Sequence, residues 1–206
     1  YRAFAETIRQ GVFDLHRSHH STDPHSGRRV SFGLVRMANI EPLVEVARRI
    51  VEAGAPEGWR LHVCVYHSQF PLVSRSTIEY HLDRALDRKV PDAVFDLPEI
   101  RAALARHPEP DQVFLVLGSP VTEVGRDHDY DWAVVEPSSA RSLIQLAGRV
   151  RRHRPEPCGD PNIVLLRRNV RSLRSPAGAA YCRPGLEGDD AWRRRSHDLE
   201  VLLRPE

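Results

Sequence analysis

The stretch VSFGLVR at residues 30–36 is a nearly continuous apolar run with the length of one β-strand. Similar runs recur as RLHVCVY (60–66), VFLVLG (113–118), WAVVE (132–136) and NIVLLRR (162–168). Strands that are apolar on both faces are typical of parallel sheets with helices on each side. The five runs therefore predict a buried, mostly parallel sheet.

Amphipathic segments with helical spacing separate these runs. The segments span 3–16, 40–53, 76–88, 98–106 and 140–151. Ser74 or Ser76 is expected to cap the third helix, because a serine hydroxyl accepts from the free N–H groups of a first turn. Ser138 or Ser139 is expected to cap the fifth in the same way. The alternation of strands and helices predicts an α/β fold with helices on both faces of the sheet.

Composition and periodicity divide the chain into three parts. Residues 1–29 contain a helix followed by the polar loop RSHHSTDPHSGRR, and residues 30–168 contain the alternating strands and helices. Residues 169–206 lose periodicity, apart from a short helical stretch near 191–203, and we expect them to lead toward a further C-terminal domain. The chain begins with tyrosine and its single methionine is internal, so we expect a piece of a longer protein.

Four histidines, His16, His19, His20 and His25, lie in or beside the polar loop. They could suggest a metal site, but their spacing matches no compact set of ligands. We therefore favour an exposed, flexible loop and expect no metal in this chain.

The overall composition indicates a globular protein of the cytoplasm. Hydrophobic residues make up 41% of the 206 residues and charged residues 28%. No run of eighteen apolar residues predicts a membrane span. Cys64, Cys158 and Cys182 are scattered and form no CxxC pair, which argues against a disulfide scaffold or a zinc ribbon.

The chain contains 30 basic residues, of which Lys89 is the single lysine. A phosphate-binding P-loop needs a lysine after a glycine-rich turn, and no glycine lies near Lys89 in DRKVPD. The chain therefore cannot carry a complete P-loop ATPase site. Basic residues outnumber acidic residues only in the part of the chain after residue 150. Arginines become frequent there from the run RVRRHR (149–154) onward. Arginine clusters suit phosphates, although a solvated surface is the alternative.

Ligands of parallel α/β sheets bind beyond the carboxyl ends of the strands. There the chain carries YHSQF (66–70), GSPVTEVGRDHDYD (118–131) and, on the following helix, QLAGRVRR (145–152). A helix over 140–151 would place Gln145, Arg149 and Arg152 on one face, as a fork for a polyphosphate. A plain surface cluster of arginines remains the alternative.

The segment 118–131 combines hydroxyl groups with acids. Ser119 and Thr122 can donate to a nucleic-acid backbone, and Gly125 permits a strained turn. Four acids, Glu123, Asp127, Asp129 and Asp131, could meet a ribose, metal-bound water or the arginines of the next helix. An acidic loop that merely ends a strand is the alternative.

The order of these segments resembles the second RecA-like domain of superfamily 2 helicases. Tyr66–Phe70 is similar to motif IV, Ser119–Asp131 to motif V and Gln145–Arg152 to motif VI. Together with YCRPGLE and SHDLEVLL in the tail, they resemble the CRISPR-associated helicase–nuclease of type I systems, subtype I-F. The resemblance covers most of residues 30–203, and it implies a RecA-like fold with a less regular C-terminal extension.

The resemblance also implies roles for individual residues. Arg149 and Arg152 would be arginine fingers that reach ATP held by a first RecA-like domain, with Gln145 orienting them. Asp127 would lie near the ribose or these arginines, beside Gly125. Leu146 stands where many relatives carry arginine, and Arg151 where glycine is common.

The resemblance implies that a second set of residues would contact the DNA. His67 and Ser68 would lie near the tracking single strand, and Ser119 would replace the usual threonine that holds a phosphate, with Thr122 close by. The parent family unwinds DNA with ATP and Mg²⁺, bound mainly by the first RecA-like domain, and cleaves DNA in a metal-binding HD domain. Its implied partners are single-stranded DNA, those two domains, the CRISPR surveillance complex and the adaptation integrase.

Three functions remain open on the sequence. The leading hypothesis is half of an ATP-dependent DNA motor, inactive by itself. The second is a RecA-like scaffold that binds nucleic acid or protein without catalysis. The third is a metal-dependent phosphohydrolase built on His128–Asp129 or His197–Asp198, although both pairs lack the flanking spacing of a nuclease centre.

Overall fold

A six-stranded sheet forms the centre of the computed structural model, which describes residues 1–90, 92–154, 156–188 and 193–204. The strand order is β3-β4-β2-β5-β6, and every neighbouring pair in it is parallel, which confirms the predicted sheet. The short β1 pairs with β2 in antiparallel fashion. The strands are β1 (Ser21–Thr22), β2 (Arg29–Arg36), β3 (Trp59–Tyr66), β4 (Asp111–Gly118), β5 (Trp132–Val135) and β6 (Ile163–Leu165).

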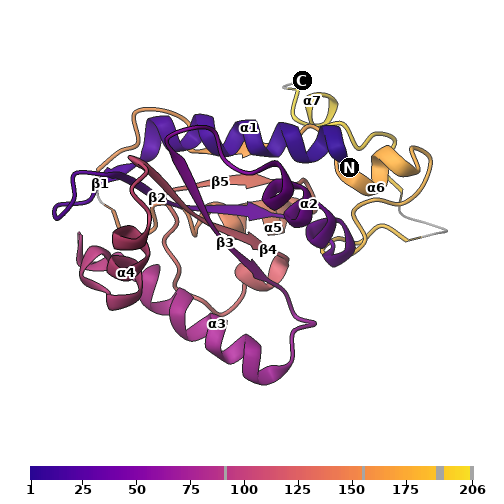
Figure 1. Ribbon diagram of the computed structural model, residues 1–206. Helices are drawn as coiled ribbons and strands as arrows, with labels where there is room; N and C mark the ends of the chain where they lie inside the picture. The colour runs from indigo at the N-terminus through magenta and orange to yellow at the C-terminus, as the bar shows by residue number, and fades with distance from the viewer. Residues whose placement is uncertain (91, 155, 189–192, 205–206) are drawn as a thin grey trace.

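Helices cover both faces of this sheet, as predicted. Figure 1 shows α1 and α2 along one face and α3 and α4 along the other. The helices are α1 (Arg2–His19), α2 (Ile40–Ala53), α3 (Leu72–Ala85), α4 (Pro98–Arg106), α5 (Ala140–Ala147), α6 (Val170–Arg174) and α7 (Leu199–Leu202), with 3-10 turns η1 (Ala93–Asp96) and η2 (Pro120–Thr122). None of the helices in the described part of the chain is long and apolar enough to cross a membrane.

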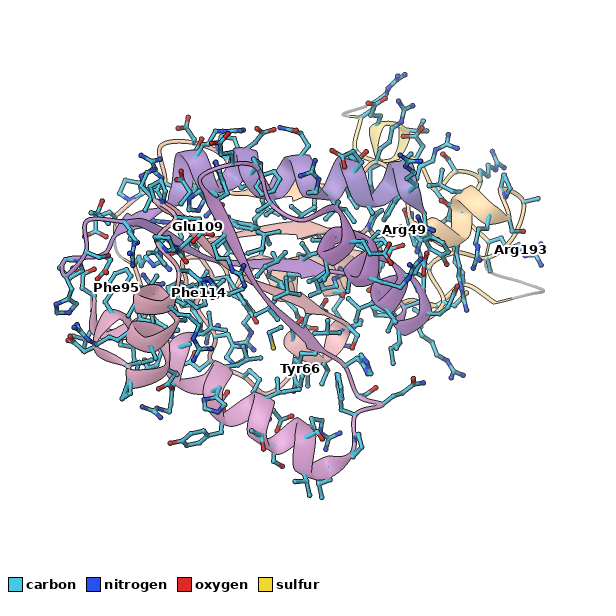
Figure 2. All side chains as sticks on the ribbon, in the orientation of Figure 1. Arg49, Tyr66, Phe95, Glu109, Phe114 and Arg193 are labelled. Atoms are coloured by element: carbon cyan, nitrogen blue, oxygen red, sulfur yellow. The ribbon has the colours of Figure 1, made fainter. Side chains whose placement is uncertain are left out.

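Two apolar cores lie between the sheet and its helices. Ile8 of α1 and Leu43 of α2 pack with Trp132 on one face. Phe95 of η1 packs on the other face. Figure 2 labels Phe95 and Phe114 on this face. Each fully buried side chain of this size contributes about 1.5–3 kcal/mol of hydrophobic free energy. The α/β fold is therefore stabilised independently from both sides of the sheet.

Gly33 of β2 permits a close contact within the sheet. It is paired with Trp132 of β5, and a Cβ atom at Gly33 would lie only 2.1 Å from the indole ring. The ring therefore covers the bare backbone of β2, and only glycine fits at this position.

Helix α5 is shorter than the sequence predicts. Ser139 caps it, as expected, by accepting from the Ser142 N–H at 3.3 Å. It ends at Ala147 rather than 151, because glycine at 148 favours the helix poorly and Val150 forms an isolated parallel bridge with Tyr130. The prediction that Gln145, Arg149 and Arg152 share one helix face is therefore wrong.

Helix α3 begins earlier than predicted, at Leu72 after Pro71, so neither Ser74 nor Ser76 caps it. Pro71 is the N-cap residue of α3, and no side chain of the described residues caps its first turn. Strand β6 is shorter than the predicted run, and the expected helical stretch near 191–203 is limited to α7 and falls in part outside the described residues.

The polar loop after α1 is also different from the prediction. Helix α1 continues to His19, and β1 follows after a single residue. His16 is fully buried, with Nδ1 2.7 Å from Ser31 Oγ and Nε2 3.1 Å from Asp111 Oδ1. The exposed-loop prediction is wrong for His16. These three side chains have the order of a hydrolase triad, but all are buried and no substrate can reach them.

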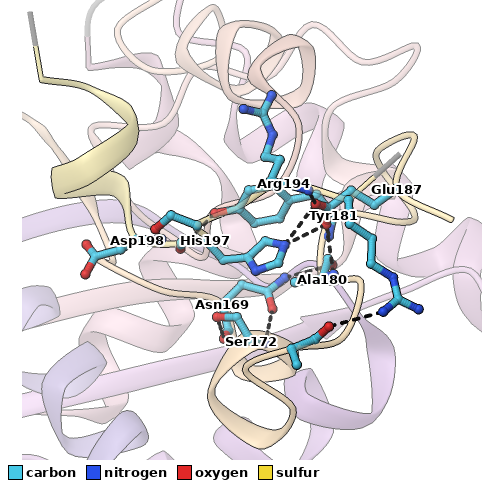
Figure 3. A network of polar contacts seen from close by, with 11 residues as sticks. Asn169, Ser172, Ala180, Tyr181, Glu187, Arg194, His197 and Asp198 are labelled. Atoms are coloured by element: carbon cyan, nitrogen blue, oxygen red, sulfur yellow. Dashed lines mark hydrogen bonds and ion pairs between the residues drawn. The ribbon is translucent and has the colours of Figure 1, made fainter. Parts of the chain in front are cut away.

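The segment after β6 is built around one carboxylate. Glu187 accepts hydrogen bonds from the backbone N–H groups of Ala180, Tyr181 and Arg194, and its Oε2 lies 2.8 Å from His197 Nε2 (Figure 3). These contacts hold the pKa of Glu187 low, at about 2, against the opposing effect of burial. The segment therefore has a defined structure despite its weak periodicity.

Candidate nucleotide and nucleic-acid sites

An open groove lies at the carboxyl edge of the sheet, beyond the ends of β2, β3 and β4. Its volume is about 1070 Å³, and Ser68 and Ser119, both predicted to contact DNA, line it. We refer to it as the carboxyl-edge groove. It is lined by residues 38–42, 68–69, 119–121, 124, 170–171, 174 and 183–184.

The loop that carries Ser119 is held from within. The Ser119 carbonyl accepts from both the N–H and the hydroxyl of Thr122, each at 3.0 Å. Thr122 is completely buried, and its methyl group lies against Gly118. The burial argues against the predicted contact of Thr122 with nucleic acid, and its side chain instead fixes the loop that presents Ser119.

His67 lies beside the groove, in the loop after β3. Its ring stacks on Phe70 with centroids 4.2 Å apart, and its Nδ1 accepts from the Gln69 N–H at 3.3 Å. Tyr66, which Figure 2 shows between the end of β3 and α3, donates its hydroxyl to Glu79 at 2.6 Å. The loop is thus shaped by its own aromatic residues.

Three arginines of the groove were not singled out in the sequence. Arg171, Arg174 and Arg183 come from the C-terminal segment and give the groove a positive lining. Arg174 is partly neutralised by Glu41, 3.1 Å away. The only signal for them was the arginine excess after residue 150, which does not say which arginines meet in space.

A buried ion pair lies under the groove. Arg36 at the end of β2 is fully buried, and its Nε lies 2.8 Å from Glu123 Oε1. Glu123 Oε2 also accepts from the Ser142 hydroxyl of α5 at 2.5 Å. Burial lowers the pKa of Arg36 and raises that of Glu123. This pair connects the Ser119 loop to α5.

Glu136 at the end of β5 extends this buried network. Its two oxygens accept from the backbone N–H groups of Ala38 at 2.6 Å and Val170 at 2.7 Å. Both N–H groups belong to segments that line the groove. The shape of the groove therefore depends on acids buried beneath it.

Two of the predicted ATP-facing residues, Asp127 and Arg152, form an ion pair elsewhere, where the carboxylate of Asp127 is exposed. Arg152 Nε lies 2.6 Å from Asp127 Oδ1, His153 Nε2 lies 3.1 Å from the same oxygen, and Lys89 Nζ lies 3.1 Å from Oδ2. The Lys89 hydrogen bond, followed by those of His153 and Arg152, lowers the pKa of Asp127 to about 2. We refer to Lys89, Asp127, Arg149, Arg152 and His153 as the cation cluster.

Arg149 joins the cluster from the turn after α5. Its Nη2 donates to the Glu123 carbonyl at 3.2 Å, and its backbone carbonyl accepts from the Tyr130 N–H at 2.9 Å. Burial and the neighbouring Arg152 lower the pKa of Arg149. A turn locked to Tyr130, rather than a helix face, therefore presents the two arginines.

Gln145 and Gly125 complete the predicted set. Gln145 is exposed on α5. Gly125 has φ +68° and open space around it, as the prediction of a strained turn requires. Asp129 and Asp131 behave differently, because both are buried and paired with Arg154 at 3.1 and 2.5 Å. They are not available to a ribose or to the fingers.

The His–Asp pairs have separate structural partners. His128 is 2.9 Å from Asp83, and His197 pairs with Glu187, while the neighbouring Asp198 pairs with Arg167 at 2.7 Å. Figure 3 shows the His197 and Asp198 side chains diverging. In the described ranges, no three His, Cys, Asp or Glu side chains are grouped so that they could hold a metal ion.

Comparisons with known proteins show the family to which the chain belongs. The family model for the C-terminal part of the CRISPR-associated nuclease/helicase Cas3 matches residues 29–155. The chain is 54% identical to the Cas3 subtype I-F/YPEST protein of Pseudomonas aeruginosa and 50% identical to that of Pectobacterium atrosepticum. Each comparison covers 99% of this chain but only 19% of the relative.

Solved structures agree on the fold. A crystal structure of T. fusca Cas3 with ATP matches with a TM-score of 0.53 and 17% identity, over 82% of this chain and 17% of that chain. The ADP form matches with a TM-score of 0.54 and 18% identity, over 84% and 18%. The family match and the two close relatives together identify the chain as a member of the CRISPR-associated nuclease/helicase Cas3 family, from its C-terminal region.

Proposed function

We propose that residues 30–168 are the second RecA-like domain of an ATP-dependent DNA helicase, with residues 169–206 leading toward a further domain. The observation that carries this proposal is the cation cluster, where the exposed Arg152 pairs with the exposed carboxylate of Asp127 and the partly buried Arg149 lies beside them. Arginines so placed can stabilise the charge of a transferring phosphoryl group.

ATP and Mg²⁺ would be held mainly by a first RecA-like domain, because this chain has no P-loop lysine. Bound ATP supplies the phosphoryl group whose transfer drives movement along DNA. The cluster fits a phosphate, because its cations already converge on the carboxylate of Asp127. Arg152 is 41% exposed, so its guanidinium can turn from Asp127 toward a nucleotide on the facing domain.

The carboxyl-edge groove would hold the single-stranded DNA. Ser68 and the N-terminus of α2 face it from one side, and Arg171 and Arg183 supply positive charge from the other. Phosphate groups favour such positively lined grooves with hydroxyl donors. His67 and Phe70 lie at its edge, where an aromatic pair can stack on a base. The HD nuclease domain, surveillance complex and integrase would be partners of the whole protein.

The test is Arg152→Ala in the full-length protein, with Arg141→Ala as the matched control. Arg141 is an exposed arginine in the first turn of α5, away from the cluster. We expect Arg152→Ala to lower DNA-stimulated ATP hydrolysis by about 10³-fold or more, with DNA affinity nearly unchanged. Wild-type turnover in Arg152→Ala would contradict the proposal and favour a scaffold that binds without catalysis.

A further inference from the structure

We propose that Lys89, the only lysine of the chain, is a third cation of the nucleotide site and binds a phosphate group of ATP together with Arg152. This inference rests on the proposed function of Arg149 and Arg152. Neither the sequence motifs nor the resemblance assigns Lys89 a role, and it lies about 60 residues before the fingers in the sequence.

The geometry points to a shared anion. Lys89 Nζ and Arg152 Nε contact the two different oxygens of the Asp127 carboxylate, at 3.1 and 2.6 Å. The two oxygens of one carboxylate are separated by less than two C–O bond lengths, so both cations converge on one small region. A phosphate group presents oxygens in a similar arrangement. The carboxylate of Asp127 therefore marks a position that a phosphate can occupy.

The charge and exposure of the cluster fit this role. Lys89, Arg149 and Arg152 face Asp127, while Asp87 contributes only a longer contact, 3.8 Å from Lys89. The cluster keeps a positive excess even with both acids ionised. Lys89 and Asp127 are about half exposed, so the carboxylate can turn into solvent and leave the cations to a ligand.

The loop that carries Lys89 is tied by its backbone to the loop that carries Asp127. The backbone carbonyl of Leu86, three residues before Lys89, accepts from the N–H of Asp129, two residues after Asp127. This hydrogen bond of 3.0 Å ties the end of α3 to the loop that carries Asp127. Lys89 therefore meets the cluster through fixed backbone rather than through a long flexible segment.

The first test compares Lys89→Gln and Lys89→Arg in the full-length protein. We expect Lys89→Gln to raise KM for ATP roughly ten-fold with little change in kcat, because a charge-assisted contact to a ground-state phosphate is lost. Lys89→Arg should restore KM. The matched control is Arg84→Gln, since Arg84 is a partly exposed cation of α3 that pairs with Glu99 at 3.4 Å outside the cluster.

The second test measures binding without turnover. The full-length protein is treated with an amine-acetylating reagent with and without a non-hydrolysable ATP analogue, and modification of Lys89 is followed by mass spectrometry. We expect the analogue to lower acetylation of Lys89 several-fold relative to lysines elsewhere in the protein. Unchanged acetylation together with an unchanged KM in Lys89→Gln overturns the inference. If Arg152→Ala still abolishes hydrolysis in that case, the proposed function stands and only the role of Lys89 falls.

Discussion

The carboxyl-edge groove and the cation cluster belong to one domain but are held together in opposite ways. Buried acids hold the segments that line the groove, with Glu123 bound to Arg36 and Ser142 and Glu136 bound to backbone N–H groups. The cluster forms around the exposed carboxylate of Asp127, with Lys89 and Arg152 exposed and Arg149 and His153 partly buried. The groove is therefore held in shape from beneath, as the proposed path for DNA requires, whereas the exposed carboxylate of the cluster is open to replacement by another anion.

The largest effect should come from the network beneath the groove. Glu123→Ala leaves Arg36 charged and fully buried without its partner, so we expect the free energy of unfolding to fall by about 3–5 kcal/mol. Urea denaturation of the domain measures this. Glu123→Gln keeps an acceptor for Ser142 and should cost less than alanine. An unfolding midpoint equal to that of the wild type would show that the groove is not held from within.

His16 is a buried titratable residue that lies outside both the groove and the cluster. Burial lowers its pKa from 6.5 to about 4, so the unfolded chain binds the proton more tightly than the folded one. Stability contributed by neutral His16 is therefore complete above pH 6.5 and is lost as the pH falls toward 4. We expect about 2 kcal/mol of pH dependence between pH 7 and pH 5 from this residue.

The measurement is the unfolding free energy of the wild type and of His16→Gln at both pH values. The difference between the two proteins should shrink on acidification, because the variant lacks the group that titrates. A constant difference across that range would contradict the pKa assigned to His16.

The charge of the groove should appear as a salt dependence of DNA binding. We expect the double variant Arg171→Gln/Arg183→Gln to make the slope of log affinity against log salt shallower by about 1.4 for single-stranded DNA. The matched control is Arg101→Gln, an exposed arginine on α4 outside the groove. An unchanged slope in the double variant would show that Arg171 and Arg183 do not contact phosphate groups of the DNA.

The smallest effect on stability should come from the cluster itself. Asp127→Asn removes an exposed carboxylate, and exposed ion pairs contribute little to folding because water and salt screen them. We expect the urea midpoint to stay at the wild-type value. A large loss of stability would show that the cluster stabilises the fold. The cluster would then not differ from the groove in this respect.

Much of the fold could be predicted because it depends on local patterns. The strands at 30–36 and 113–118 are continuous apolar runs, and the helix over 40–53 has a single apolar face, so their positions agree with the structure to within two residues. The end of α5 could not be predicted from such patterns, since the bridge between Val150 and Tyr130 is a contact between distant segments.

The site was predictable only in part, for a related reason. Residue type, position after the strands and the family resemblance selected Ser68, Ser119, Asp127 and Arg152, each of which lines the groove or belongs to the cluster. Spacing could not reveal that Thr122 points into the protein, nor that Lys89 approaches Asp127 from the loop after α3. These features depend on which segments the fold brings together, and no local pattern encodes them.

We propose that Arg149 and Arg152 complete a nucleotide site from the second domain. The most direct measurement is an experimental structure of the full-length protein with a non-hydrolysable ATP analogue and single-stranded DNA. We predict that both guanidinium groups lie within hydrogen-bond distance, about 3 Å, of phosphate oxygens, with Arg152 released from Asp127. A structure in which Arg152 keeps its Asp127 contact and neither arginine approaches the phosphates would contradict the claim.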